Sequence, residues 1–225
     1  MANGGTVAPQ QNTRLNPHGM LQRWDLCASN WAYKTLGRQV PRDVWIGLEH
    51  SGNGLVWLPL VAGLLCMPQL SPLARHLVAN FFLGFWTDLI IVGLLKGIVR
   101  RPRPSYNNPD DFLLVVAVDK WSFPSGHASR VAYMAGFACV IAAANGSHMG
   151  VATTVWGTVV ALSRALLGRH YLGDICAGAL VGILNTALIT KGTFSATNLL
   201  VPAELTDHIY QEASRMCLGV MDRWT

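Results

Sequence analysis

Residues 77–104 read LVANFFLGFWTDLIIVGLLKGIVRRPRP, an apolar run that passes directly into a basic segment. A helix needs roughly 20 mainly apolar residues to cross the hydrocarbon core of a bilayer. Residues 77–95 meet that requirement with a single charged residue, Asp88, among them. The cations that follow, from Lys96 to Arg103, are typical of a helix end at a membrane surface. The segment therefore predicts a transmembrane helix with a basic end.

The composition of the whole chain also indicates a membrane protein. Of its 225 residues, 51% are hydrophobic and only 13% are charged, and the mean hydropathy is +0.32. A typical soluble domain is about 25% charged, so this chain has too few charges to cover a water-exposed surface. The high apolar content excludes a largely disordered chain. Five scattered cysteines without a CxxC pair exclude a disulfide scaffold and give little support to a metal or redox site.

Four further apolar segments have the character of membrane spans, namely residues 54–67, 128–144, 149–167 and 174–190. The last three are rich in glycine and alanine, which let transmembrane helices approach one another closely. We therefore expect an all-α fold, a polytopic membrane helical bundle of about five to six spans. The net charge of +5 comes from basic residues at the ends of these segments, which favours anionic lipid over nucleic acid as a partner.

The chain divides into four predicted parts. Residues 1–18 are polar and predict a disordered tail, and residues 19–44 predict an interfacial amphipathic helix with its linker. Residues 45–192 form the predicted transmembrane domain, and residues 193–225 form a C-terminal tail without a further span. For residues 19–37 a soluble helix packed on the rest of the protein remains the alternative.

Three short motifs stand at the ends of the predicted spans. They are KGIVRRPRP at residues 96–104, PSGH at residues 124–127 and SRALLGRHYLGD at residues 163–174. Either no crossing or two crossings of the membrane separate one motif from the next. All three motifs are therefore expected on one face of the membrane, at one end of the bundle.

The cations in these motifs predict an anion site. Lys96, Arg103 and Arg164 would meet at one place, and arginine binds a phosphate or carboxylate through two parallel hydrogen bonds. Ser125 and Gly126 open a helix whose first backbone N–H groups have no partner within that helix, which is a favourable position for an anion.

The two motif histidines predict nucleophilic catalysis at that site. Asp174 follows His170 by four residues and would hydrogen-bond the imidazole and fix its tautomer, as the base is oriented in a catalytic triad. His170 would attack phosphorus, and His127 would protonate the leaving oxygen. This chemistry needs a neutral His170 and a protonated His127, so the rate is expected to follow a bell-shaped pH profile.

With all three motifs complete, the chain resembles the type 2 phosphatidic acid phosphatase superfamily, which shares its motifs with the vanadium haloperoxidases. The resemblance covers about residues 45–190 and makes residues 45–192 a catalytic domain. It implies that His170 is the nucleophile that becomes phosphorylated, that His127 is the general acid, and that Asp174 supports the nucleophile. It also implies phosphate-binding roles for Lys96, Arg103, Ser125, Gly126 and Arg164. Neither a metal nor a cofactor is implied, and the only adjacent acidic pair, Asp110 and Asp111, is not expected to bind one.

The sequences that contain the second and third motifs, VDKWSFPSGHAS and SRALLGRHYLGD, resemble the polyisoprenoid diphosphate phosphatase branch most closely. That branch implies a metal-independent membrane phosphatase acting on presqualene, farnesyl and geranylgeranyl diphosphates, and on lipid monophosphates of the phosphatidate type. A non-catalytic membrane scaffold and a transporter of anionic lipid are the alternatives. The family usually crosses the membrane six times, whereas five apolar segments and an interfacial helix are present here. The sequence leaves the oligomeric state open.

The basic residues also predict the orientation in the membrane. Beyond the three motif cations, ten lie on the expected site face and four on the other. The ten are Arg14, Arg23, Lys34, Arg38, Arg42, Arg100, Arg101, Lys120, Arg130 and Arg169, and the four are Arg75, Lys191, Arg215 and Arg223. This asymmetry favours a cytoplasmic catalytic face. The resemblance implies the endoplasmic reticulum and nuclear envelope as the location.

Two features leave alternatives open. Residues 105–123 carry the apolar stretch FLLVVAV and Trp121, and they either lie on the membrane at the lipid entry or pack on the bundle. Asp88, inside the predicted span, either pairs with a cation of the site or forms a hydrogen bond inside the bundle.

Overall fold

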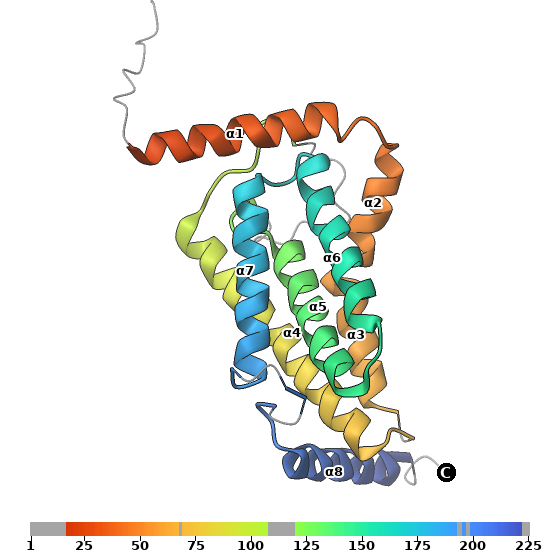
Figure 1. The fold of residues 1–225 in the computed structure, drawn as a ribbon. Helices are drawn as coiled ribbons and strands as arrows, with labels where there is room; N and C mark the ends of the chain where they lie inside the picture. Colours follow the sequence, from red (N-terminus) through yellow and green to blue (C-terminus); the bar gives the residue numbers. More distant parts are fainter. Residues whose placement is uncertain (1–16, 68, 108–119, 193–194, 197–198, 222–225) are drawn as a thin grey trace, which may run out of the picture.

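The computed structural model describes residues 17–67, 69–107, 120–192, 195–196 and 199–221, in which the regular elements are eight α-helices. These helices are α1 (Pro17–Thr35), α2 (Arg42–Ser51), α3 (Gly54–Leu65), α4 (Pro72–Val99), α5 (Gly126–Asn145), α6 (Met149–Leu166), α7 (Leu172–Ile189) and α8 (Ala203–Met221). Helices α4 to α7 form a bundle, α1 lies across one end of it and α8 lies across the other (Figure 1). The predicted all-α fold is confirmed.

Some predicted features fall outside the described residues. Most of the expected N-terminal tail does, although Pro17 and His18 already belong to α1. The apolar part of the loop at residues 105–123 and the two acids of that loop, Asp110 and Asp111, also lie outside the described residues.

Four of the described helices, α4, α5, α6 and α7, are long and apolar enough to cross a membrane. The first predicted span is shorter than expected, because α3 has 12 residues and therefore extends for about 18 Å. The Asn53 side chain ends the preceding turn and starts α3 by accepting a hydrogen bond from Leu55 N at 3.0 Å. Helix α2 precedes α3, and the two follow one another along the side of the bundle (Figure 1).

Helix α5 is the centre of the bundle, because it packs closely on both α6 and α7. Two glycines of α7 permit this approach: a Cβ atom at Gly178 or Gly182 would clash with the carbonyl oxygen of Ser125 or Ser129, respectively. Asp88 of α4 is fully buried and accepts a hydrogen bond from Ser129 Oγ. Of the two alternatives for Asp88, the structure therefore shows the hydrogen bond inside the bundle.

The opposite end of the bundle is closed by α8. Arg75, in the first turn of α4, lies 3.4 Å from Asp207 and stacks over the ring of Tyr210 with its guanidinium carbon 4.0 Å from the centroid. Tyr210 in turn donates a hydrogen bond from its hydroxyl to the carbonyl of Met67 at 2.6 Å. Helix α4 ends, α5 begins, α6 ends and α7 begins at the other end, beneath α1 (Figure 1).

Candidate active site

The predicted site residues gather at the α1 end of the bundle. Lys96 lies in the last turn of α4, and Arg164 lies in the last turn of α6. His127 lies in the first turn of α5 and interacts electrostatically with Arg164, His170 and Lys96. Arg103, in the segment after α4, donates a hydrogen bond from Nη1 to the carbonyl of Arg169 at 3.3 Å. The three motifs thus meet in space.

His170 is oriented by a backbone carbonyl. Its side chain is 1% exposed, and its Nδ1 lies 2.7 Å from the carbonyl oxygen of Ser122. Because a carbonyl can only accept a hydrogen bond, Nδ1 carries the proton in the neutral ring and Nε2 carries the lone pair. Asp174 Oδ2 lies 3.7 Å from the same Nδ1, beyond hydrogen-bonding distance. The hydrogen bond expected from Asp174 is therefore made by Ser122, and Asp174 acts on the ring through its charge.

Both oxygens of Asp174 accept hydrogen bonds from groups other than His170. Its Oδ2 accepts a hydrogen bond from Tyr171 N at 3.0 Å, which caps the start of α7. Its Oδ1 accepts one from Arg101 Nη1 at 2.7 Å. The carboxylate is fully buried, and these partners hold its Oδ2 at 3.7 Å from Nδ1 of His170.

The start of α5 is anchored on α7. Ser125 is the N-cap of α5, and its side chain accepts a hydrogen bond from Ala128 N at 3.4 Å. Its own backbone N–H donates to the carbonyl of Asp174 at 3.0 Å. Gly126 follows, where an added Cβ would lie 3.3 Å from a methyl group of Val92. The first N–H groups of α5 are thereby held beside the cations, where an anion would be stabilised.

The sequence predictions missed two charged residues of the site, Glu49 and Arg169. They lie with Lys96, Arg103 and Arg164 in one group of charged side chains, which we call the cationic cluster. Glu49 of α2 is 7% exposed; its Oε1 lies 2.5 Å from Arg164 Nη1 and its Oε2 lies 3.5 Å from Arg169 Nη2. Arg169 and Lys96 are also buried. Glu49 thus pairs with two buried cations, Arg164 and Arg169, and arginine side chains held in this way are suited to bind a phosphate. Arg169 could have been found because it directly precedes His170, whereas an isolated glutamate outside the motifs gave no signal.

Replacing Glu49 with glutamine is expected to lower the unfolding temperature in detergent, because two buried guanidinium groups lose their carboxylate. Breaking a buried ion pair in this way costs about 3–5 kcal/mol. Inorganic phosphate should raise the unfolding temperature of Glu49→Gln by more than it raises that of the unchanged protein. Glu212→Gln is the control, since Glu212 pairs with Arg215 at 2.7 Å on the surface and such pairs contribute little. Equal unfolding temperatures for the two variants would contradict the role given to Glu49.

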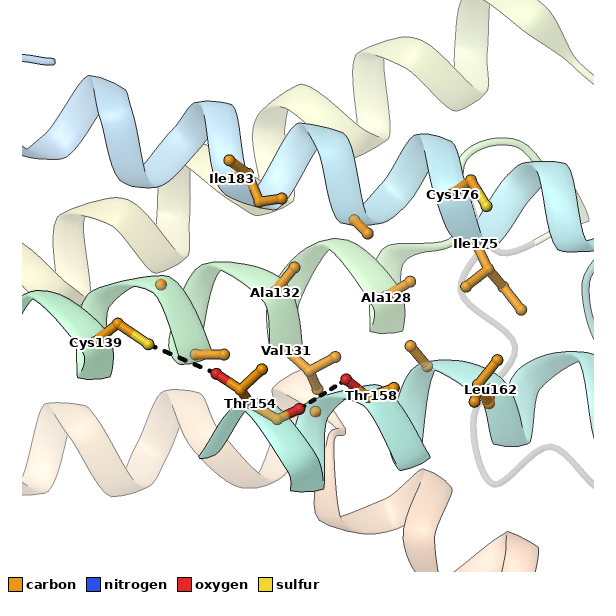
Figure 2. A pocket seen from close by; sticks show the side chains of 15 residues that line it. Ala128, Val131, Ala132, Cys139, Thr154, Thr158, Leu162, Ile175, Cys176 and Ile183 are labelled. Atoms are coloured by element: carbon orange, nitrogen blue, oxygen red, sulfur yellow. Dashed lines mark hydrogen bonds between the residues drawn. The ribbon is translucent and has the colours of Figure 1, made fainter. Parts of the chain in front are cut away.

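An apolar groove of about 400 Å³ lies between α6 and α7, with α5 as its floor (Figure 2). Small residues such as Ala132 and Ala135 form much of it, and Thr154 and Thr158 line one wall. Ala128, which directly follows His127 in α5, also lines the groove. Among the described residues, no group of three or more histidines, cysteines or acids could hold a metal ion.

Comparison with known proteins places this site in a family. The PAP2 superfamily model matches residues 77–197, which include all three motifs. The chain is 42% identical over 169 residues to a protein named probable lipid phosphate phosphatase beta from Arabidopsis thaliana, covering 64% of this chain and 77% of that protein. It is 32% identical over 145 residues to decaprenylphosphoryl-5-phosphoribose phosphatase from Mycobacterium tuberculosis, covering 64% and 75% respectively.

Solved structures share the fold. A transmembrane PAP2 type phosphatidylglycerolphosphate phosphatase from Bacillus subtilis superposes with a TM-score of 0.58 at 24% identity, covering 74% of this chain and 82% of that one. Aquifex aeolicus LpxE superposes with a TM-score of 0.54 at 22% identity, covering 71% and 90%. The family match and the close relatives confirm the resemblance drawn from the motifs. The chain is an integral membrane protein and a phosphatase that belongs to the PAP2 superfamily.

Proposed function

We propose that this protein hydrolyses polyisoprenoid diphosphates, and also lipid monophosphates, through a phosphohistidine formed on His170. The observation that carries the proposal is the hydrogen bond of 2.7 Å between His170 Nδ1 and the carbonyl of Ser122. It leaves Nε2 as the nucleophilic nitrogen of a buried imidazole next to a cluster of buried cations.

Binding of the phosphate group is the first step. Lys96, Arg103 and Arg164, with Ser125 and Gly126 at the start of α5, would hold its oxygens. Buried cations of fixed position also stabilise the charge that develops on those oxygens as phosphorus is attacked. Arg164 is already held by the protein before substrate arrives, since it contacts Glu49.

The chemical steps use both histidines. Nε2 of His170 forms a bond to phosphorus while the bond from phosphorus to the leaving oxygen breaks, and His127 donates a proton to that oxygen. His127, now neutral, takes a proton from water, whose oxygen attacks the phosphohistidine and releases inorganic phosphate with a free His170. Asp174 stabilises the imidazole through its charge at 3.7 Å. No step draws on a metal or a cofactor.

Lipids are the proposed substrate class because the site lies at the end of α4 to α7, where the head group of a lipid resides while its chain stays in the bilayer. The names of the relatives agree with this class, since they are probable lipid phosphate phosphatase beta and decaprenylphosphoryl-5-phosphoribose phosphatase. The proposed preference for polyisoprenoid diphosphates rests on the amino-acid sequence around the motifs. We propose that the site faces the cytoplasm because of the distribution of lysine and arginine. We propose a location in the endoplasmic reticulum and nuclear envelope because of the family resemblance.

The test is phosphate release by the purified full chain in detergent containing EDTA, with farnesyl diphosphate and phosphatidic acid as substrates. We expect both to release phosphate, EDTA to leave the rates unchanged, and farnesyl diphosphate to be the faster substrate. Binding of both lipids without turnover would contradict a phosphatase and favour a scaffold or a transporter of anionic lipid.

A further inference from the structure

The start of α7, which carries Asp174, is capped by side chains from α1. Asp25 Oδ1 accepts a hydrogen bond from Gly173 N at 2.8 Å, and the fully buried Ser29 Oγ accepts one from Leu172 N at 2.9 Å. The first N–H groups of a helix have no partner within the helix, so another element must supply one. The fit is close, because an added Cβ at Gly173 would lie 2.9 Å from Asp25 Oδ2.

Arg101 joins this cap to the site. Its Nη2 lies 2.7 Å from Asp25 Oδ2 and its Nη1 lies 2.7 Å from Asp174 Oδ1, so one guanidinium group bridges two carboxylates. The guanidinium carbon lies 4.0 Å from the centroid of the Tyr171 ring. Burial alone would lower the pKa of Arg101, but the hydrogen bond and charge of Asp25 and the charge of Asp174 together raise it above its ordinary value. The bridge therefore remains charged over the working pH range.

The backbone of Arg101 reaches His170 by a second route. Its carbonyl oxygen accepts hydrogen bonds from Ser122 N at 2.8 Å and from Ser122 Oγ at 3.2 Å. The carbonyl of Ser122 is the group that orients His170 Nδ1. Arg101 thus contacts the supports of the nucleophile from both sides, through its side chain to Asp174 and through its backbone to Ser122.

We propose that Arg101 and Asp25 are positioning residues for the reaction, and that α1, which lies across the ends of α6 and α7, is part of the catalytic unit (Figure 1). Asp25 fixes the guanidinium of Arg101, which fixes Asp174 beside His170. This inference rests on the proposed function, because it assigns Arg101 and Asp25 to the attack by His170.

The test compares steady-state kinetics of single and double variants on farnesyl diphosphate. Arg101→Gln is expected to lower kcat by about 10–100-fold, the loss seen when an outer partner of a functional histidine is removed. KM should stay within about threefold, since both ends of the guanidinium are bound to carboxylates and not to the phosphate site. Asp25→Asn keeps an oxygen that can accept the hydrogen bond from Gly173 N and removes only the charge that pairs with Arg101. It should therefore lower kcat less than Arg101→Gln, and the double variant should have a kcat no lower than that of Arg101→Gln alone. Arg101→Lys, which keeps the charge, should recover part of the rate.

The control is Arg100→Gln, which removes the neighbouring cation. Arg100 is exposed and donates a hydrogen bond from Nε to the carbonyl of Gly97 in its own helix at 2.7 Å, so kcat should not change. Additive losses in the double variant, or a wild-type kcat for Arg101→Gln, would overturn the positioning role while leaving the phosphatase intact.

A second measurement does not depend on turnover. Vanadate can form a bond to the imidazole nitrogen with the geometry of the attacked phosphorus, whereas inorganic phosphate binds through the cations alone. Arg101→Gln should weaken vanadate binding by about tenfold and leave phosphate binding unchanged. Equal weakening of both anions, or of neither, would overturn the inference even if the proposed substrates were wrong.

Discussion

Replacing His170 with glutamine is expected to reduce phosphate release from farnesyl diphosphate by about 10⁴-fold or more, with the fold preserved. Loss of a covalent nucleophile costs this much because the remaining groups can only bind and polarise the substrate. A glutamine amide can still donate a hydrogen bond to the carbonyl of Ser122, so the surrounding backbone keeps its support. The measurement is initial rates in detergent with EDTA, beside unfolding temperatures of both proteins.

The control for this variant is His208→Gln, which changes an exposed histidine on α8 at the opposite end of the bundle. It should keep the full rate. A His170→Gln protein that retains a rate within tenfold of the unchanged protein would remove His170 from the role of nucleophile.

Replacing His127 with glutamine should have an effect that depends on the leaving group. A general acid contributes about 10²–10⁴-fold, and it contributes most when the leaving oxygen is strongly basic. Phosphatidic acid expels an alkoxide, whereas farnesyl diphosphate expels a phosphate monoester, which leaves far more easily without a proton. We therefore expect His127→Gln to lose about 10³-fold on phosphatidic acid and clearly less on farnesyl diphosphate.

Two further observations check this role of His127. The predicted bell-shaped pH profile should lose its alkaline limb in His127→Gln, because that limb reports deprotonation of the acid. His148→Gln, at an exposed helix start on the far side of the bundle, should behave as the unchanged protein. Equal losses on the two substrates would show that His127 does not protonate the leaving oxygen.

The spans and the motifs could be predicted because each depends on residues close together in sequence. An apolar run such as residues 77–95 specifies a membrane helix by itself, and the structure has α4 there. An even number of membrane crossings separates one motif from the next, which predicts that the helix ends carrying the motifs meet on one face of the membrane. The start of the first span was also predicted, since the apolar run 54–67 begins where Asn53 caps α3, but α3 ends at Leu65, two residues before the run does.

The supports of the site could not be predicted, because they pair groups that are far apart in the chain. The carbonyl of Ser122 is a backbone atom without a sequence signature, yet it orients His170. Glu49 and Asp25 are single acids in segments without a motif, and only the packing of α2 and α1 on the bundle brings them to Arg164 and Arg101. Sequence thus identifies the groups proposed to act on phosphate, and the fold shows what holds them in place.

Transfer of phosphate to Nε2 of His170 can be demonstrated by trapping the phosphoenzyme. His127→Gln would be mixed with excess farnesyl diphosphate, because this variant should still be phosphorylated but should activate water poorly. The reaction would be stopped in alkali and the site located by mass spectrometry. We predict one phosphate per chain, on Nε2 of His170, since Nδ1 donates to the carbonyl of Ser122. Phosphate on Nδ1, phosphate on another residue, or turnover without any phosphoenzyme would contradict attack by Nε2 of His170.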